Sequence, residues 1–156
     1  MSQHHKYMLE AIEEAKKSLE SGDVPIGAVI VKDNLIIGRG HNQVEKLQNA
    51  TVHAEMIAIS EAIKKVEYKH LLDSTIYVTL EPCSMCAGAI VLARIPTLVY
   101  AATDPKTGAC SSLYSITSDA RLNHRCEVIK GILEDECSKQ IKEFFVKVRE
   151  RKQVLS

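Results

Sequence analysis

The chain has 156 residues, of which 46% are hydrophobic and 26% charged, a size and composition typical of one globular domain with a buried core. The 20 basic residues balance the 20 acidic ones, so the total charge favours neither nucleic acid nor a membrane surface as a partner. Aromatic residues make up only 4% and Trp is absent, which argues against an aromatic platform for single strands. These totals alone favour a small neutral substrate.

The first residues, MSQHHKYMLEAIEEAKK, lack the apolar core of a secretory signal. The sequence has no run of 18 apolar residues, so we expect no membrane span. The five cysteines are an odd number, which favours free thiols or metal ligands over a disulfide framework. We therefore expect a cytoplasmic protein.

The N-terminal half predicts a helix, a hairpin and a second helix. Apolar residues recur at helical spacing before Gly22, a plausible stop, at positions Met8, Ile12, Ala15 and Leu19. Residues 25–31 (PIGAVIV) and 35–40 (LIIGRG) flank Asp33 and Asn34, a pattern that predicts a β-hairpin with a tight turn. Residues 54–66 have the apolar spacing of a helix.

The C-terminal half predicts strands at 75–80 and 97–102 on either side of a helix at 85–93. Residues 103–125 are polar and rich in turn signals, which is long for a plain connection and favours a functional or partly helical segment. A weaker strand follows at 126–131. A closing helix is marked by Leu133, Cys137, Ile141, Phe144, Phe145 and Val148.

This order of elements predicts an α/β fold with three α/β/α layers. Its five-stranded mixed sheet would be mostly parallel after the hairpin, with helices on both faces. The sequence contains no internal repeat, low-complexity tract or interdomain linker. We therefore expect a single domain covering residues 1–156.

Two short motifs indicate a metal site. Cys83 and Cys86 are three residues apart at a predicted helix start, so both sulfurs lie on one face, a pair that Zn²⁺ accepts readily. His53 begins the other motif, His-Ala-Glu, also at a helix start. These three ligands leave one coordination position open, which is typical of catalytic zinc, and Glu55 would act as a proton carrier rather than a ligand.

Each motif has an ordinary alternative when taken alone. A Cys-x-x-Cys pair in an intracellular α/β protein also suits a thioredoxin-like redox motif or two buried thiols. A lone His-x-Glu occurs by chance. The two motifs together match the H-x-E…P-C-x-x-C signature of zinc deaminases, which favours catalytic zinc. His124 and Cys126 are not expected as further ligands, because they would close the open position.

Longer blocks extend the match over nearly the whole chain. They are VPIGAVIV, GRGHN, TVHAEMIAI, TIYVTLEPCSMCAGAI, ARIP, DPKTGA, LNHR and KGILEDEC. With these blocks the sequence resembles the bacterial tRNA-specific adenosine deaminases, a branch of the cytidine deaminase superfamily. The blocks DPKTGA and LNHR are the more diagnostic ones for this branch. The chain departs from the usual pattern at 49–52 (NATV) and at Thr103.

The resemblance implies a cytidine-deaminase-like fold, one Zn²⁺ per subunit and a homodimer. It implies His53, Cys83 and Cys86 as zinc ligands and Glu55 as the catalytic proton shuttle. Residues implied to contact the target base or its flanking nucleotides are Pro25, Ile26, Asn42, Ala54, Asp104, Lys106 and Asn123. The implied reaction is hydrolytic deamination of adenosine to inosine at the wobble position of a tRNA anticodon stem-loop, by zinc-activated water.

Two other functions stay open on the sequence. One is deamination of a free base or nucleoside, such as cytosine or guanine, against which the DPKTGA and LNHR blocks argue. The other is a noncatalytic zinc-containing RNA-binding subunit, against which Glu55 argues.

The neutral total conceals a polarity along the chain. Residues 139–152 contain six basic and two acidic residues, a net +4, whereas residues 10–23 contain five acidic and two basic residues, a net −3. A basic closing helix suits contact with phosphates. A merely solvated helix face explains the same pattern equally well.

Overall fold

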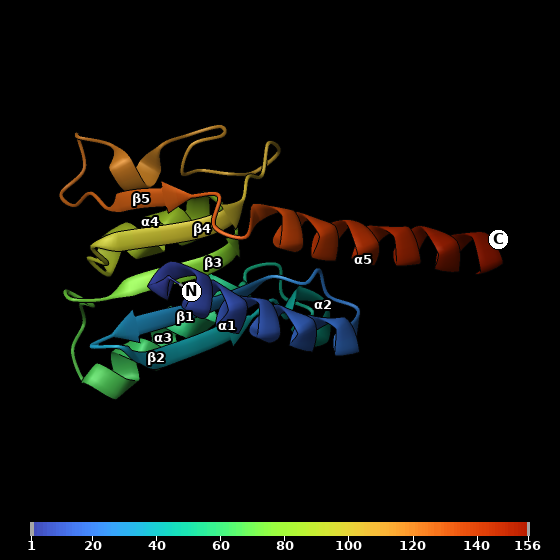
Figure 1. Ribbon diagram of the computed structural model, residues 1–156, viewed down its shortest axis with the longest axis horizontal. Helices are drawn as coiled ribbons and strands as arrows, with labels where there is room; N and C mark the ends of the chain where they lie inside the picture. Colours follow the sequence, from blue (N-terminus) through green and yellow to red (C-terminus); the bar gives the residue numbers. More distant parts are fainter. Residues whose placement is uncertain (1, 156) are drawn as a thin grey trace.

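A mixed five-stranded sheet forms the centre of the molecule in the computed structural model, which describes residues 2–155 (Figure 1). The strands are β1 (Gly27–Lys32), β2 (Leu35–His41), β3 (Thr75–Leu80), β4 (Thr97–Ala102) and β5 (Glu127–Lys130). Their spatial order is β2-β1-β3-β4-β5. β1 pairs antiparallel with β2 and β3, whereas β3/β4 and β4/β5 are parallel.

Helices cover both faces of this sheet. They are α1 (Gln3–Lys17), α2 (Val44–Leu47), α3 (Ala54–Val66), α4 (Ser84–Leu92) and α5 (Glu134–Leu155), with short 3-10 turns at Ser18–Ser21 and Ile116–Ser118. α1 and the start of α5 pack on one face, and α3 and α4 pack on the other (Figure 1). Each face has its own apolar core, so the three-layer α/β/α prediction is confirmed.

The turn signals act where the sequence predicts them. Asp33 and Asn34 both have positive φ, the backbone of the tight turn that joins β1 to β2. Gly22 is left-handed and ends the helical segment that begins with α1. The sequence did not predict α2, whereas α5 contains most of the apolar positions that mark the predicted closing helix.

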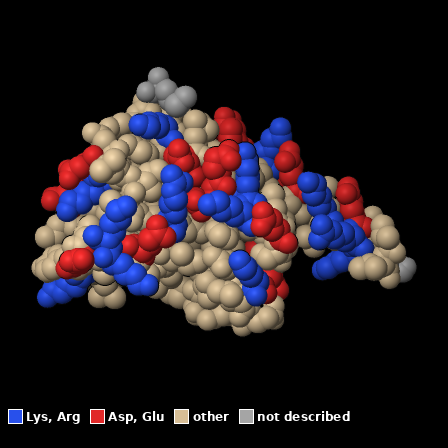
Figure 2. All heavy atoms as spheres, turned by 90° about the horizontal axis from the view of Figure 1, so that it is seen from below, with Lys and Arg blue, Asp and Glu red and all other residues tan. Residues whose placement is uncertain are grey.

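Because β3 and β4 are parallel, their carboxyl ends lie side by side at the same end of the sheet. The N-termini of α3 and α4 meet there, as the contacts of His53 with Cys83 and Cys86 show. α5 starts near this end and extends well beyond the sheet (Figure 1). Figure 2 shows acidic and basic side chains intermixed over the body, with Lys and Arg gathered along the projecting part of α5. Among the described residues, no helix is both long and apolar enough to cross a membrane.

Candidate metal centre and substrate pocket

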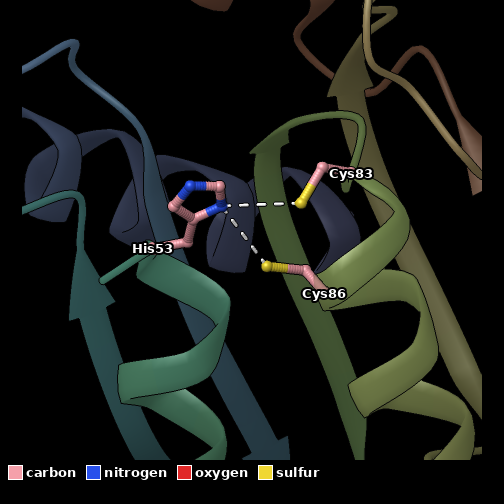
Figure 3. A group of neighbouring side chains, drawn as sticks. All are labelled: His53, Cys83 and Cys86. Atoms are coloured by element: carbon pink, nitrogen blue, oxygen red, sulfur yellow. Dashed lines mark hydrogen bonds between the residues drawn. The ribbon is translucent and has the colours of Figure 1, made fainter. Parts of the chain in front are cut away.

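Three side chains with metal-binding atoms meet at the edge of the sheet where α3 and α4 begin. The Nδ1 atom of His53 lies 3.5 Å from Cys83 Sγ and 3.6 Å from Cys86 Sγ, with the imidazole facing both sulfurs (Figure 3). All three potential ligand atoms lie within 4.8 Å of one another. No other group of three such side chains occurs within residues 2–155. The two predicted motifs therefore form one site.

The spacing of this cluster fits tetrahedral zinc. Zinc–sulfur bonds of about 2.3 Å and zinc–nitrogen bonds of about 2.0–2.1 Å, at tetrahedral angles, separate sulfur from nitrogen by about 3.6 Å. The observed separations match this value. Two sulfurs and one imidazole nitrogen are also a donor set that suits zinc. The residues present therefore fit the ion and supply three of its four ligands.

Helix starts position each of the three side chains. His53 is the N-cap of α3 and Cys83 the N-cap of α4, both in extended backbone, and Cys86 follows in the first turn of α4. Gly40 of β2 permits close packing against α3, because a Cβ there would overlap the carbonyl oxygen of Ala54. The glycine on β2 thus allows the first turn of α3 to pack directly against the strand.

The charges at the cluster favour a thiolate. The hydrogen bond with Cys86, together with that from His53, lowers the pKa of Cys83 to about 4 despite its partial burial. The hydrogen bond with Cys83 raises the pKa of His53. The hydrogen bond with Cys83, together with burial, raises the pKa of Cys86. The positive end of α4 adds to this preference for negative sulfur.

Glu55 lies in the first turn of α3, beside the cluster, and is only 4% exposed. Burial raises the pKa of its carboxyl group to about 7. A carboxyl group with a pKa near neutrality both accepts and releases a proton readily, which is the property of a general acid–base residue. This location beside the cluster suits the proton-carrier role that the sequence predicts for Glu55.

A cavity of about 80 Å³ opens at the cluster. Its lining residues are Ile26, Asn42, His53, Ala54, Glu55, Leu80, Glu81, Cys83, Asp104 and Thr107. Of the predicted substrate contacts, the structure brings together Ile26, Asn42, Ala54 and Asp104. Asn42 is held in place by donating from Nδ2 to the carbonyl oxygen of Val24 and by accepting at Oδ1 from the Val44 N–H.

A larger groove of about 500 Å³ adjoins the cavity and shares Ile26, Asn42 and Asp104 with it. Lys106, another predicted contact, is exposed and lines this groove. The opposite wall comes from α5, with Ile141, Lys142 and Phe145 among its residues. The cavity therefore continues into a groove that passes between the 104–107 segment and α5.

Two predicted contacts lie outside both spaces. Pro25 is buried just before β1 and lines neither the cavity nor the groove. Asn123 is exposed, and its carbonyl oxygen accepts a hydrogen bond from Arg94, just past the far end of α4. Because α4 has nine residues, this position is about 13 Å along the helix from the cysteines. The fold does not bring Asn123 to the cluster of its own chain.

Glu81 is a site residue whose role the sequence did not reveal. It lines the cavity, yet it is only 2% exposed. Burial alone would raise the pKa of its carboxyl group, but hydrogen bonds from Ser112, Asp104 and Ser111 outweigh burial and hold the pKa at about 2. The available signal was an acidic residue directly after an apolar strand, where a charge costs most unless it is hydrogen-bonded.

The remaining cysteines do not join the site. Cys110, Cys126 and Cys137 are free and buried, and Cys137, an apolar marker of the predicted closing helix, packs in the core between α5 and the sheet. His124 Nε2 and Cys126 Sγ both lie within hydrogen-bond distance of the Ile95 carbonyl oxygen. They are therefore occupied as donors, away from the cluster.

Comparisons with known proteins agree with this geometry. The family model of the MafB19-like deaminases matches residues 2–149. The chain belongs to this deaminase family. A tRNA-specific adenosine deaminase of Streptococcus pyogenes serotype M3 is 51% identical over 148 residues, covering 95% of this chain and 86% of that protein. A tRNA-specific adenosine deaminase of Bacillus subtilis is 48% identical over 152 residues, covering 97% and 94%.

A solved structure from work on A-to-I editing by tRNA:A34 deaminases at the wobble position of transfer RNA is also similar to this deaminase. It superimposes with a TM-score of 0.82 at 40% identity, covering 86% of this chain and 98% of that one. The cytidine-deaminase-like fold expected from the sequence is therefore confirmed.

Proposed function

We propose that this deaminase converts adenosine to inosine at the wobble position of tRNA, with one zinc ion per subunit. The observation that carries the proposal is the cluster of His53, Cys83 and Cys86, spaced for tetrahedral zinc and open toward a cavity that contains buried Glu55. The names of the two relatives and the subject of the similar structure support tRNA adenosine as the substrate.

Glu55 has the central role in the proposed reaction. When bound, zinc supplies Lewis-acid activation of the attacking water. The Glu55 carboxylate accepts a proton from that water as the water oxygen bonds to C6, and it delivers this proton to the ring nitrogen. Glu55 then transfers the remaining proton of that oxygen to the amino group, which leaves as ammonia as the C6–N bond breaks and the C6 carbonyl forms. Burial of the carboxyl group keeps bulk water from competing for this proton.

The shape and charge beyond the cavity support an RNA substrate rather than a free base. The cavity opens into the groove, which has room for nucleotides that flank the target. Lys106 and Lys142 stand on the two walls of that groove, where they neutralise phosphates. The zero net charge of the whole chain therefore does not argue against RNA, because basic residues are concentrated on α5 (Figure 2).

We further infer a homodimer that forms through the outer face of α4. This helix contains no charged residue, and Leu92 at its end is 77% exposed. An apolar helix face of this kind is normally covered in an assembly.

The proposal also includes a single domain over residues 1–156, roles for Pro25 and Asn123 in substrate binding, and a cytoplasmic location, where tRNA is found.

The substrate is tested by offering zinc-loaded enzyme an anticodon stem-loop with adenosine at the wobble position and, separately, free adenosine, cytosine and guanine. We expect inosine in the RNA, detected by nucleoside mass spectrometry, and little ammonia from the free compounds. Ammonia from a free base without inosine in the RNA would instead establish a free-base deaminase. If no inosine forms in the RNA and no ammonia is released from the free compounds, the result would support a noncatalytic subunit.

The assembly is tested by sedimentation of the wild type and the Leu92→Asp variant. A charge placed in an apolar interface destabilises it, so we expect a dimer for the wild type and a folded monomer for the variant. A monomeric wild type at micromolar concentration would rule out the dimer.

A further inference from the structure

Glu81 is a buried carboxylate that the proposed reaction does not use. It follows β3 directly and precedes the turn of Pro82 and Cys83 at the start of α4. It is 2% exposed, and within residues 2–155 no basic side chain lies at ion-pair distance from it. Such a charge is stable in the interior only when neutral hydrogen-bond donors surround it.

Five donors do so, and all come from one segment of the chain. Glu81 Oε1 accepts from the Asp104 N–H at 3.0 Å and from the Ser112 hydroxyl at 2.5 Å. Glu81 Oε2 accepts from the N–H groups of Cys110, Ser111 and Ser112 at 3.1, 2.9 and 2.9 Å. One carboxylate thus holds both ends of the loop that runs from 104 to 112.

This loop forms part of the substrate path. Asp104 and Thr107 line the cavity, and Lys106 lines the groove. Within the loop, the Asp104 carboxylate accepts from the backbone N–H groups of Lys106 and Thr107 and from the Thr107 hydroxyl. The Asp104 side chain is therefore engaged in shaping the turn. Where this turn lies relative to the cavity depends on the hydrogen bonds between the loop and the Glu81 carboxylate.

The same loop is attached to the metal-ligand turn. The Ala109 N–H donates to the Pro82 carbonyl oxygen at 2.9 Å, and Gly108 pairs with Cys83 in an isolated β-bridge. Gly108 passes so close to Glu81 that a Cβ would overlap the carboxyl group. Glycine at 108 is thus the residue that lets the loop reach its anchor.

From this geometry we infer that Glu81 is a positioning residue, which fixes the 104–107 wall of the substrate path relative to the zinc-ligand turn. The inference rests on the proposed function, because it assigns the wall to RNA binding. It separates two tasks within one pocket. Glu55 acts on the reacting atoms, whereas Glu81 acts only through the loop that contacts the substrate.

Glu81→Gln keeps the size of the side chain but replaces one acceptor oxygen with an NH₂ group. Two or three of the five loop donors then face another donor, so the loop loses its fixed position. The expected result is a KM for the anticodon stem-loop raised about tenfold or more, with kcat changed less than about threefold and zinc retained at the wild-type level.

The experiment compares wild type, Glu81→Gln and Glu127→Gln, which changes an exposed carboxylate at the start of β5. Steady-state kinetics, zinc content and amide hydrogen exchange are measured for each. We expect faster exchange at Cys110, Ser111 and Ser112 only in Glu81→Gln. Slow exchange at these residues with an unchanged KM would overturn the inference, because Glu81 would then not hold the loop. Fast exchange with an unchanged KM would also overturn it, because the position of the loop would then not affect binding.

Gly108→Ala provides a second test that does not remove the carboxylate. It displaces the loop from its anchor, so we expect the same rise in KM, and little further rise when it is combined with Glu81→Gln. Fully additive effects would contradict a shared mechanism. If the wild-type enzyme makes no inosine in RNA, the proposed function fails; if it does and the variants keep the wild-type KM, only this inference fails.

Discussion

The molecule places a histidine close to cysteine at each end of α4, with opposite outcomes. At the start of the helix, His53 Nδ1 faces two sulfurs at 3.5 and 3.6 Å. Beyond its other end, His124 and Cys126 both direct their hydrogen atoms at the carbonyl oxygen of Ile95. The first group turns its nitrogen and sulfur atoms toward one another, whereas the second directs its polar atoms at a backbone carbonyl oxygen.

The difference shows that residue types near one another do not by themselves make a metal site. The ligand group forms where two helices begin, so that N-cap geometry aims the side chains and the helix termini favour thiolate. The other group lies in the turns before β5, where an unpaired carbonyl oxygen needs donors. The predictions below test this contrast from the largest expected effect to the smallest.

Cys83→Ala removes one of the three zinc ligands, so we expect loss of zinc and a fall in deamination of at least about a thousandfold. Cys126→Ala is the matched control at the other end of α4 and should keep wild-type zinc. Metal analysis together with inosine formation tests both variants. Full zinc occupancy in Cys83→Ala would show that this thiol is not a ligand.

Asn42→Ala removes a 6%-exposed amide that lines the cavity. The Val24 carbonyl oxygen and the Val44 N–H also lose their partners. We expect kcat/KM for the stem-loop to fall between about tenfold and a hundredfold at unchanged zinc content. A value of kcat/KM equal to that of the wild type would remove Asn42 from the substrate contacts.

Asn123 lies beyond the far end of α4, away from the cluster of its own chain, so in the proposed homodimer we expect it to serve the site of the partner subunit. Asn123→Ala should therefore be complemented by Glu55→Ala in a mixed dimer, because the site with intact Glu55 receives Asn123 from the other chain. Mixing the two weakly active variants and measuring inosine tests this. Mixtures no more active than their components would place any role of Asn123 within its own chain.

Asp119 marks the smallest expected effect, since its ion pair with Arg121 is exposed. The hydrogen bonds from Arg121 lower the pKa of Asp119 to about 2, below its usual 3.8. The stabilisation is therefore present above about pH 4 and is lost as the pH falls from 4 toward 2. Asp119→Asn should lower Tm slightly at pH 7 in low salt and less in high salt. A salt-independent loss of Tm would contradict an electrostatic origin.

Much of this architecture was predictable because local signals and tertiary packing agree. Residues 54–66, 75–80 and 97–102 match α3, β3 and β4 in both bounds, since apolar periodicity and turn residues coincide there. The pairing of Cys83 and Cys86 was predictable because a three-residue spacing at a helix start places both sulfurs on one face.

Other features depend on contacts distant in sequence. α2 has only four residues, and buried Asp23 accepts hydrogen bonds from the N–H groups of Glu45 and Lys46 at its start. Glu81 binds a loop that begins 23 residues later. The place of Asn123 depends on the crossover from β4 to β5. None of these relations leaves a periodic pattern in the sequence.

The most direct test measures inosine formation in a wobble-adenosine stem-loop by zinc-loaded wild type and zinc-loaded Glu55→Ala. The wild type should form inosine, and the variant should hold the same amount of zinc while its turnover falls by about a thousandfold or more, because the proton carrier is absent. Wild-type turnover in zinc-loaded Glu55→Ala would contradict the assignment of the buried carboxylate and, with it, the proposed mechanism.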